Sequence, residues 1–199
     1  MSEKRDLLLR KGAEIVHLKG FHHTGINEIL EAAEVPKGSF YFYFTSKEDF
    51  GLQLIDYYST QFITKSREYL ARSELPYLLR LREFFNDFLL FFDGQGCTLG
   101  CPIGNLAQEM GDLSENFRQR LGKVLTSMKQ GVEKFLKGAV EQGEIPSSLD
   151  IESLSDFIIN SWEGALIRMK VTKDKSPLIL FDKILFETIL RLDSGSDKD

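Results

Sequence analysis

The chain has 199 residues, which is enough for one large domain or two small ones. It is 42% hydrophobic and 28% charged, and 30 acidic residues against 25 basic ones give a formal net charge of −5. This balance excludes a histone-like or wholly basic nucleic-acid binder, so any DNA contact must come from a locally placed surface. No apolar run resembles a signal peptide or is long enough to span a bilayer. We therefore expect a cytoplasmic protein with no membrane partner and two reduced cysteines.

Helical periodicity runs through most of the chain. The first helix is expected to end at Gly20, which acts as its stop. A short second helix is expected over 26–33, with Thr24 as its N-cap. Ser46, followed by Asp49 three residues later, resembles a capping box and predicts a long helix from that point.

Prolines and a capping aspartate mark the later helix starts. Pro76 and Pro102 stand at the first turns of two helices, and Asp150 is expected to cap another. The last helix is expected to open at Pro177 and to end near Leu192. The chain is thus predicted to be all-α, with about nine helices.

Five consecutive aromatic residues, from Phe40 to Phe44, have the composition of a strand. No partner strand is predicted nearby, and a lone strand cannot satisfy its backbone N–H and C=O groups. We therefore predict a helix. Five successive aromatic side chains on a helix cannot all point inward, so at least two of them must be exposed.

Residues 24–47 have the layout of a helix-turn-helix, with a tight turn at 33–35 and a second helix of about two turns opened by Pro36. In this motif the second helix enters the major groove of DNA. The expected exposed face consists of Lys37, Gly38, Ser39, Tyr41 and Tyr43. Lysine, serine and tyrosine side chains can contact phosphates or base edges, and glycine lets the backbone approach closely. The alternative is an aromatic core patch.

The segment Val35-Pro-Lys-Gly-Ser-Phe-Tyr-Phe-Tyr-Phe-Thr-Ser-Lys-Glu-Asp-Phe50 closely resembles the TetR family of bacterial repressors, also called TetR/AcrR. The resemblance covers about residues 5–55. It implies DNA contacts by Ser39, Tyr41, Tyr43, Lys47 and Thr24. Glu34 stands where most members of the family have glycine, a position at which a positive φ would strain a residue with a side chain.

The resemblance also implies a domain organisation and a set of partners. Residues 1–47 are expected to form the DNA-binding domain, residues 48–192 an effector-binding and dimerisation domain, and residues 193–199 a disordered tail. The implied partners are double-stranded operator DNA, a small-molecule or electrophile effector, and a second copy of the chain.

The last two helices are expected to pair with their copies in a four-helix bundle. The apolar stripes of both helices allow this, although such stripes can equally form intramolecular core. The expected interface residues are Phe157, Ile158, Ser161, Ala165, Ile184 and Thr188.

Cys101 falls at the expected N-cap of the helix that Pro102 begins. A helix N-terminus stabilises a thiolate, and flanking glycines leave the sulfur little shielded. This is the profile of a sensor cysteine. The alternative is a small, buried structural residue.

Three segments resemble a subgroup of the family that regulates electrophile-detoxifying reductases: Ala33-Glu-Val-Pro-Lys-Gly-Ser-Phe-Tyr41, Gly100-Cys101 and Asp112-Leu-Ser-Glu115. Glu34 is matched in that subgroup. There the cysteine equivalent to Cys101 is the sensor, and a lysine after a Trp-x-Gly-Ala segment lies near it, which implies Lys170 in this chain. The expected effector cavity is lined by Phe85, Phe88, Phe92, Leu106, Met110, Phe117 and Trp162.

The sequence therefore predicts a ligand- or electrophile-responsive DNA-binding repressor that binds a palindromic operator as a dimer and is released by an effector. One alternative is a regulator of drug or metabolite efflux with a non-covalent effector, and a lesser one is a helical binding module without DNA activity. No Gly-rich phosphate loop and no Ser/His/Asp set is present, so an enzyme is not predicted. No cofactor is implied, and a zinc site needs more ligands than Cys97 and Cys101 supply.

Overall fold

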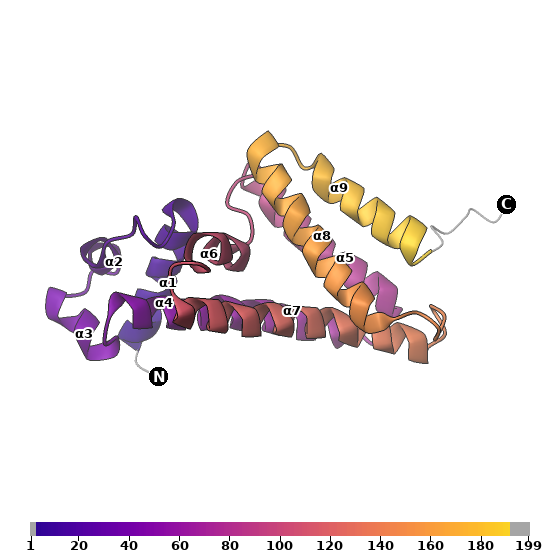
Figure 1. Cartoon of the computed structure of the whole chain (residues 1–199), viewed down its shortest axis with the longest axis horizontal. Helices are drawn as coiled ribbons and strands as arrows, with labels where there is room; N and C mark the ends of the chain where they lie inside the picture. The colour runs from indigo at the N-terminus through magenta and orange to yellow at the C-terminus, as the bar shows by residue number, and fades with distance from the viewer. Residues whose placement is uncertain (1–2, 192–199) are drawn as a thin grey trace. The chain divides into compact units, whose positions relative to one another are not determined.

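The computed structural model of the chain describes residues 3–191, and in this range it is all-α, as predicted (Figure 1). The elements are α1 (Glu3–Lys19), α2 (Ile26–Ala32), a 3-10 turn (Lys37–Ser39), α3 (Phe40–Tyr43), α4 (Lys47–Leu70), α5 (Tyr77–Gly94), α6 (Pro102–Met110), α7 (Glu115–Glu141), α8 (Ile151–Thr172), α9 (Ser176–Lys183) and a π-helical segment (Ile184–Ile189). None of the described helices is both long and apolar enough to cross a membrane.

The residues at the helix ends explain most of these bounds. Gly20 follows α1 with a φ of +89°, a conformation that favours glycine. The Ser46 hydroxyl accepts a hydrogen bond from the backbone N–H of Asp49 at 3.0 Å, so Ser46 caps α4 as predicted. In a capping box the Asp49 carboxylate would accept from the N–H of Ser46. Here it accepts instead from the N–H of the preceding residue, Thr45, at 2.8 Å. Asp150 caps α8 by accepting from the N–H of Ser153 at 3.1 Å.

Two predicted helix ends are corrected. The N-cap of α2 is Gly25 rather than Thr24, and no side chain caps this helix. The Thr24 hydroxyl donates instead to the carbonyl of Gly20 at 2.7 Å, which holds it inside the turn. The last predicted helix is not uniformly α-helical, because α9 ends at Lys183 and the chain continues as the π-helical segment. The predicted end at Leu192 and the predicted tail, residues 193–199, lie outside the described residues.

The described chain forms two compact units. The first contains residues 3–61 and 101–126, and the second contains residues 62–100 and 127–191. The helix-turn-helix therefore shares a unit with α6 and the first part of α7. The division at residue 47 stays a prediction about function, because the compact units are not contiguous stretches of the chain.

The first unit is built around aromatic side chains. The rings of Phe21 and Phe117 lie 5.0 Å apart between centroids, and a Cβ added at Gly51 of α4 would collide with both rings. The absence of a side chain at Gly51 is thus what lets the two rings pack against α4. Tyr58, on the same helix as Gly51, donates its hydroxyl to the carbonyl of Ala13 of α1 at 2.7 Å. Burial of this side chain raises the pKa of its phenol.

The second unit packs α5, α8 and α9 around three aromatic rings. Phe85, Trp162 and Phe181 come one from each of these helices, with centroids 4.9–5.1 Å apart. Edge and tilted ring contacts of this kind stabilise beyond the area that they bury. Glu144 fixes the start of α5, because its carboxylate accepts from the N–H groups of Tyr77 at 2.6 Å and Leu78 at 2.8 Å.

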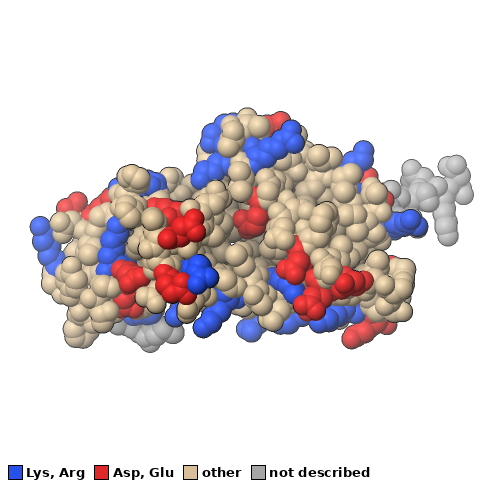
Figure 2. All heavy atoms as spheres, in the orientation of Figure 1, with Lys and Arg blue, Asp and Glu red and all other residues tan. Residues whose placement is uncertain are grey.

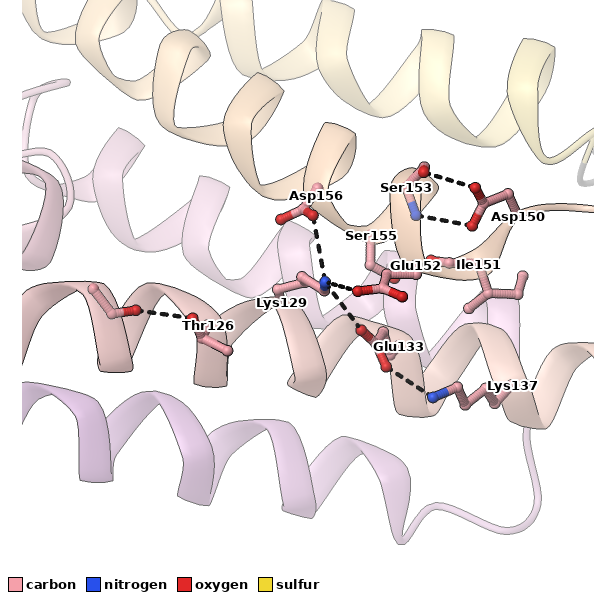
Figure 3. Close-up of polar contacts among 11 residues, drawn as sticks. Thr126, Lys129, Glu133, Lys137, Asp150, Ile151, Glu152, Ser153, Ser155 and Asp156 are labelled. Carbon is pink, nitrogen blue, oxygen red and sulfur yellow. Dashed lines mark hydrogen bonds and ion pairs between the residues drawn. The ribbon is translucent and has the colours of Figure 1, made fainter.

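A charged network joins α7 to the start of α8 (Figure 3). The Lys129 ammonium lies 2.8 Å from Glu152, 3.4 Å from Asp156 and 3.7 Å from Glu133. The hydrogen bond to Glu152 is the main cause that raises the pKa of Lys129. Glu133 also pairs with Lys137 at 2.8 Å. On this side of α7 the charged residues therefore pair either with one another or with residues of α8.

We predict that Gly51→Ala destabilises the first unit. The added methyl group has no room beside the rings of Phe21 and Phe117, and overpacking of a core costs about 1–3 kcal/mol in the free energy of unfolding. Chemical denaturation monitored by circular dichroism measures this loss. Gly122→Ala in α7 is the matched control, because a Cβ there meets nothing within 4 Å and should stabilise the helix by up to about 1 kcal/mol. Equal stability of the two variants would contradict the packing argument.

Candidate DNA-binding site

The turn between α2 and α3 is set by one residue with an unusual backbone. Glu34 has a φ of +53°, so the strained position anticipated from the sequence is present. The turn is closed by hydrogen bonds from the N–H of Glu34 to the carbonyl of Glu31 at 3.1 Å and from the N–H of Val35 to that of Leu30 at 3.0 Å. Pro36 then precedes the 3-10 turn with extended backbone angles. These residues place two helices in succession with a short reversal between them, as a helix-turn-helix requires.

The second helix of the motif consists of the 3-10 turn and α3, so the prediction of a helix rather than a strand is confirmed. Phe40 and Phe44 are fully buried, and both rings pack against Phe50 of α4 at 5.0–5.6 Å. Tyr41 is 64% exposed and Phe42 is 81% exposed. Phe40 and Phe44 therefore anchor the helix in the core, while Tyr41 and Phe42 face solvent.

The structure leaves most of the predicted contact residues accessible. Lys37 and Gly38 are exposed, and Ser39 and Tyr43 are half-buried beside the exposed Tyr41. Phe42 was missing from the prediction, although it is the most exposed of the five aromatics. The signal that could have found it is the rule that five successive aromatics on a helix cannot all face the core.

Two predicted DNA contacts are placed differently from the rest. Thr24 is only 1% exposed and its hydroxyl is bonded to Gly20, so we leave it out of the contact surface. Lys47 is half-buried at the start of α4, where its ammonium donates to the carbonyl of His22 at 3.2 Å and lies 4.8 Å from the ring centroid of Phe21. Burial lowers the pKa of Lys47, and the charge of Glu109 opposes that shift. A phosphate contact by Lys47 stays a prediction.

Glu109 in α6 holds the turn that precedes the motif. Its carboxylate accepts from the N–H of Phe21 at 2.8 Å and from the N–H of His22 at 2.6 Å. Because Lys47 bonds the carbonyl of His22, the turn is fixed through both its donors and its acceptor. Sequence reasoning missed Glu109, since the contacts join residues 87 and 88 positions apart and no local pattern marks them.

Cys101 lies at the other end of α6. Its sulfur accepts from the N–H of Gly104 at 3.4 Å, which confirms its predicted place as N-cap. Neither cysteine is in a disulfide; Cys101 is half-buried and Cys97 is buried. Lys170 is an exposed residue of α8 in the second unit, whereas Cys101 belongs to the first, so a contact between them stays a prediction.

The residues of the predicted effector cavity fall into both compact units. Leu106, Met110 and Phe117 are buried in the first unit. In the second unit Phe85 lies against Trp162, Phe92 is buried, and Phe88 stacks on Phe62 with centroids 6.1 Å apart. A cavity shared by all seven residues stays a prediction.

A groove of about 250 Å³ runs between α8 and α9, and most of its lining is apolar. Four of the predicted interface residues line this α8–α9 groove, namely Phe157, Ser161, Ala165 and Ile184, and Thr188 is exposed on the π-helical segment. Ile158 is fully buried, so it belongs to the core of its own chain. This corrects its assignment to a subunit interface, because α8 turns Ile158 inward and Phe157 outward.

Charge on the visible surface is mixed. Figure 2 shows acidic and basic side chains side by side over the first unit, and a group of basic side chains over the end of α8 and the loop that follows it. The first unit has no uniformly basic face in this view, in agreement with the net charge of −5. Binding to DNA must then depend on a few placed contacts more than on bulk attraction.

Comparison with known proteins agrees with this geometry. The model of bacterial regulatory proteins of the tetR family matches residues 8–54, which contain the motif, and the model of the tetracyclin repressor-like C-terminal domain matches residues 78–184. The HTH-type transcriptional repressor DhaR of Mycobacterium sp. (strain GP1) is 34% identical over 94% of this chain and 92% of its own length. The transcriptional regulator AcuR of Cereibacter sphaeroides is 38% identical over 88% of this chain and 80% of its own.

A solved structure extends the likeness to the whole fold. The reduced form of Escherichia coli NemR has a TM-score of 0.83 at 28% identity, and the match covers 92% of this chain and 96% of that one. Both family models and both sequence relatives describe regulators. The chain therefore belongs to the TetR family of bacterial regulatory proteins and is a helix-turn-helix transcriptional repressor of that family.

Proposed function

We propose that this repressor binds a palindromic operator as a homodimer and that an effector releases it by acting on α6. The observation that carries the DNA-binding part is the solvent-exposed pair Tyr41 and Phe42 on a helix anchored by the buried Phe40 and Phe44. Both rings make edge contacts with their neighbours Phe40 and Tyr43, yet most of each side chain stays open to solvent. They supply ring faces for sugars and thymine methyl groups, and Tyr41 supplies a hydroxyl for a phosphate.

The neighbouring residues complete a contact surface of mixed chemistry. Lys37 brings a positive charge to the N-terminal end of the helix, and Ser39 and Tyr43 add hydroxyl groups beside it. A Cβ at Gly38 would meet nothing within 4 Å, so packing within the chain does not require glycine there. Close approach of the backbone to DNA gives a reason for it.

We predict that Tyr41→Ala weakens operator binding about tenfold, since loss of one specific contact in a DNA interface costs roughly 1–3 kcal/mol. Tyr41 is exposed, so helicity and thermal stability should not change. Fluorescence anisotropy with labelled operator DNA at fixed salt measures the affinity. Phe91→Ala is the matched control, because Phe91 is a comparably exposed aromatic on α5, outside the motif. Equal losses from the two substitutions would show that the contact surface lies elsewhere.

The α8–α9 groove supports the dimer. Phe157 is 52% exposed, Leu180 53% and Ile184 43%, and the three side chains line one groove. A contiguous apolar surface that is exposed to solvent in a single chain marks a site of protein–protein contact. Ser161, Gly164 and Ala165 leave room on α8 for a second helix to approach closely. We therefore assign the groove to contact with the same groove of a second copy, an arrangement that twofold symmetry permits.

We predict that Phe157→Glu splits the dimer, because a carboxylate buried without a partner costs several kcal/mol. Sedimentation velocity at micromolar concentration should show dimers for the wild type and monomers for the variant. Val171→Glu is the matched control, since Val171 lies on the same helix at 77% exposure and does not line the groove. A monomeric wild type, or a variant that remains dimeric, would refute this interface.

The effector part of the proposal rests on α6, which has Cys101 at its start and Glu109 in its last turn. A covalent adduct on the Cys101 sulfur would displace the acceptor that caps the N–H of Gly104. Movement of α6 would then reach Phe21 and His22 through the carboxylate of Glu109. All of these residues lie in the first unit, together with the motif. The reduced form in which the E. coli relative was solved fits a redox-responsive thiol.

The chemistry proposed for this thiol is addition to an electrophilic carbon, as in an unsaturated carbonyl compound. The thiolate forms the carbon–sulfur bond and the product takes up one proton from water, so no other reactant is needed. A bond between Cys101 and Lys170 is an oxidative alternative that requires contact between the two side chains. A regulator with a non-covalent effector is the second candidate, favoured by the aromatic cluster of Phe85, Trp162 and Phe181.

We predict that Cys101→Ser binds operator DNA normally and is no longer released by N-ethylmaleimide, because serine can still cap α6 but cannot add to the reagent. Cys97→Ser is the matched control; it keeps Cys101, so it should be released like the wild type. Anisotropy of a preformed operator complex during titration measures release. Release of Cys101→Ser at the wild-type concentration of reagent would assign the thiol a structural role and favour the non-covalent effector.

A further inference from the structure

A second groove, of about 140 Å³, lies between the later half of α4 and the later half of α7. All of its lining belongs to the second unit, so it is separate from both the recognition helix and Cys101. Part of the wall is apolar, with Phe62 and Leu70 from α4. The polar part comes from both helices and contains Ser66, Arg67, Gln130 and Lys134.

Ser66 is the buried polar group of the α4–α7 groove. It is only 3% exposed, and within residues 3–191 its hydroxyl has no hydrogen-bond partner. Ser155 of α8 is similarly buried, yet its hydroxyl donates to the carbonyl four residues earlier at 2.7 Å. Gly131 borders the groove at Ser66, because a Cβ added there would lie in ordinary contact, 3.5 Å from the Ser66 hydroxyl and 3.5 Å from the ring of Phe62. A hydroxyl that lines a groove and has no partner among the described residues is suited to a ligand, since it can both donate and accept.

The charges around the groove have one sign. Arg67 and Lys134 both line it, and in the described part of the chain neither forms an ion pair or a hydrogen bond through its side chain. No carboxylate is among the lining residues, although the chain as a whole has more acids than bases. The adjacent acid on α7 is Glu133, and it is held by Lys129 and Lys137. Figure 3 shows Glu133 bonded to both lysines, with the ammonium of Lys129 between α7 and α8.

We propose that the α4–α7 groove binds a small organic anion, a carboxylate with a short hydrocarbon chain. The planar guanidinium of Arg67 can hold both carboxylate oxygens, and the Lys134 ammonium adds a second positive charge. The Ser66 hydroxyl and the Gln130 amide can donate hydrogen bonds, while Phe62 and Leu70 cover the hydrocarbon. The volume of about 140 Å³ restricts the ligand to a few non-hydrogen atoms, because drug-sized ligands occupy pockets of roughly 300–1,000 Å³.

Isothermal titration calorimetry of the full-length protein with sodium butyrate tests this proposal. The titration is done without DNA and at constant ionic strength, with 1-butanol, n-butylammonium and inorganic phosphate as comparison probes. Butyrate should bind saturably with one site per chain, and the alcohol and the amine should not bind. Equal binding of butanol, or binding of phosphate in place of butyrate, would overturn the proposal. Because neither DNA nor a thiol reagent is present, this result is independent of the operator and Cys101 experiments.

Variants locate the site. Arg67→Gln and Lys134→Gln should each weaken butyrate binding about tenfold, the usual loss for one charge-assisted hydrogen bond. Ser66→Ala should weaken it several-fold. Lys137→Gln is the matched control, because it removes the same charge from the same helix, where Lys137 pairs with Glu133 at 2.8 Å and does not line the groove. Equal losses for Lys134→Gln and Lys137→Gln would show non-specific attraction and overturn the assignment; circular dichroism checks that each variant is folded.

Discussion

The burial of Phe40 and Phe44 is the constraint on which the DNA-binding surface depends. The two residues are four positions apart, so on a helix they lie on one face, and both are fully buried against Phe50. Of the three residues between them, Tyr41 and Phe42 point outward and Tyr43 is half-buried. A strand would have alternated the same five residues and placed Phe40, Phe42 and Phe44 together. The choice of helix therefore decides which aromatic side chains are available to DNA.

The anchoring contacts of the first unit also connect the motif to α6. Phe21 packs on Phe117 of α7, and the turn at Phe21 and His22 is bonded to Glu109 of α6. Lys47 bonds the same turn from the start of α4. A change at the C-terminal end of α6 thus has a short physical path to the turn before the motif and to the start of α4, through hydrogen bonds of 2.6–3.2 Å. The energy required is small, because a tenfold change in operator affinity corresponds to about 1.4 kcal/mol between two states.

Much of the fold could be predicted because its signals are local. Gly20, Ser46, Asp150 and Cys101 each end or cap a helix through contacts within a few residues, and each was identified from the sequence alone. Thr24 has the chemistry of an N-cap, but its hydroxyl found a nearer acceptor in the carbonyl of Gly20. The sequence alone cannot decide whether the Thr24 hydroxyl bonds the first N–H groups of α2 or the carbonyl of Gly20.

The features that escaped prediction depend on contacts between distant parts of the chain. Glu109 and Glu144 are single carboxylates whose backbone partners lie 66–88 residues away, so no spacing rule finds them. Ile158 and Phe157 are adjacent apolar residues, and only the direction in which α8 packs shows which of them faces solvent. The α4–α7 groove was not predicted for the same reason, since Ser66 and Lys134 are far apart in the sequence and are brought together only by packing of the two helices.

The negative net charge of the chain makes individual contacts to DNA important. A protein with a net charge of −5 gains little from long-range attraction to DNA, so discrimination must come from the shape and chemistry of a small surface around Tyr41. The same balance makes a cation without a carboxylate partner informative. Lys65, Arg72, Arg82 and Arg120 each face an acid at 2.5–2.9 Å, whereas Arg67 and Lys134, within the described residues, face the groove that holds Ser66. Two cations that line one groove together, with a buried serine and no carboxylate in the lining, indicate an anion from outside the chain.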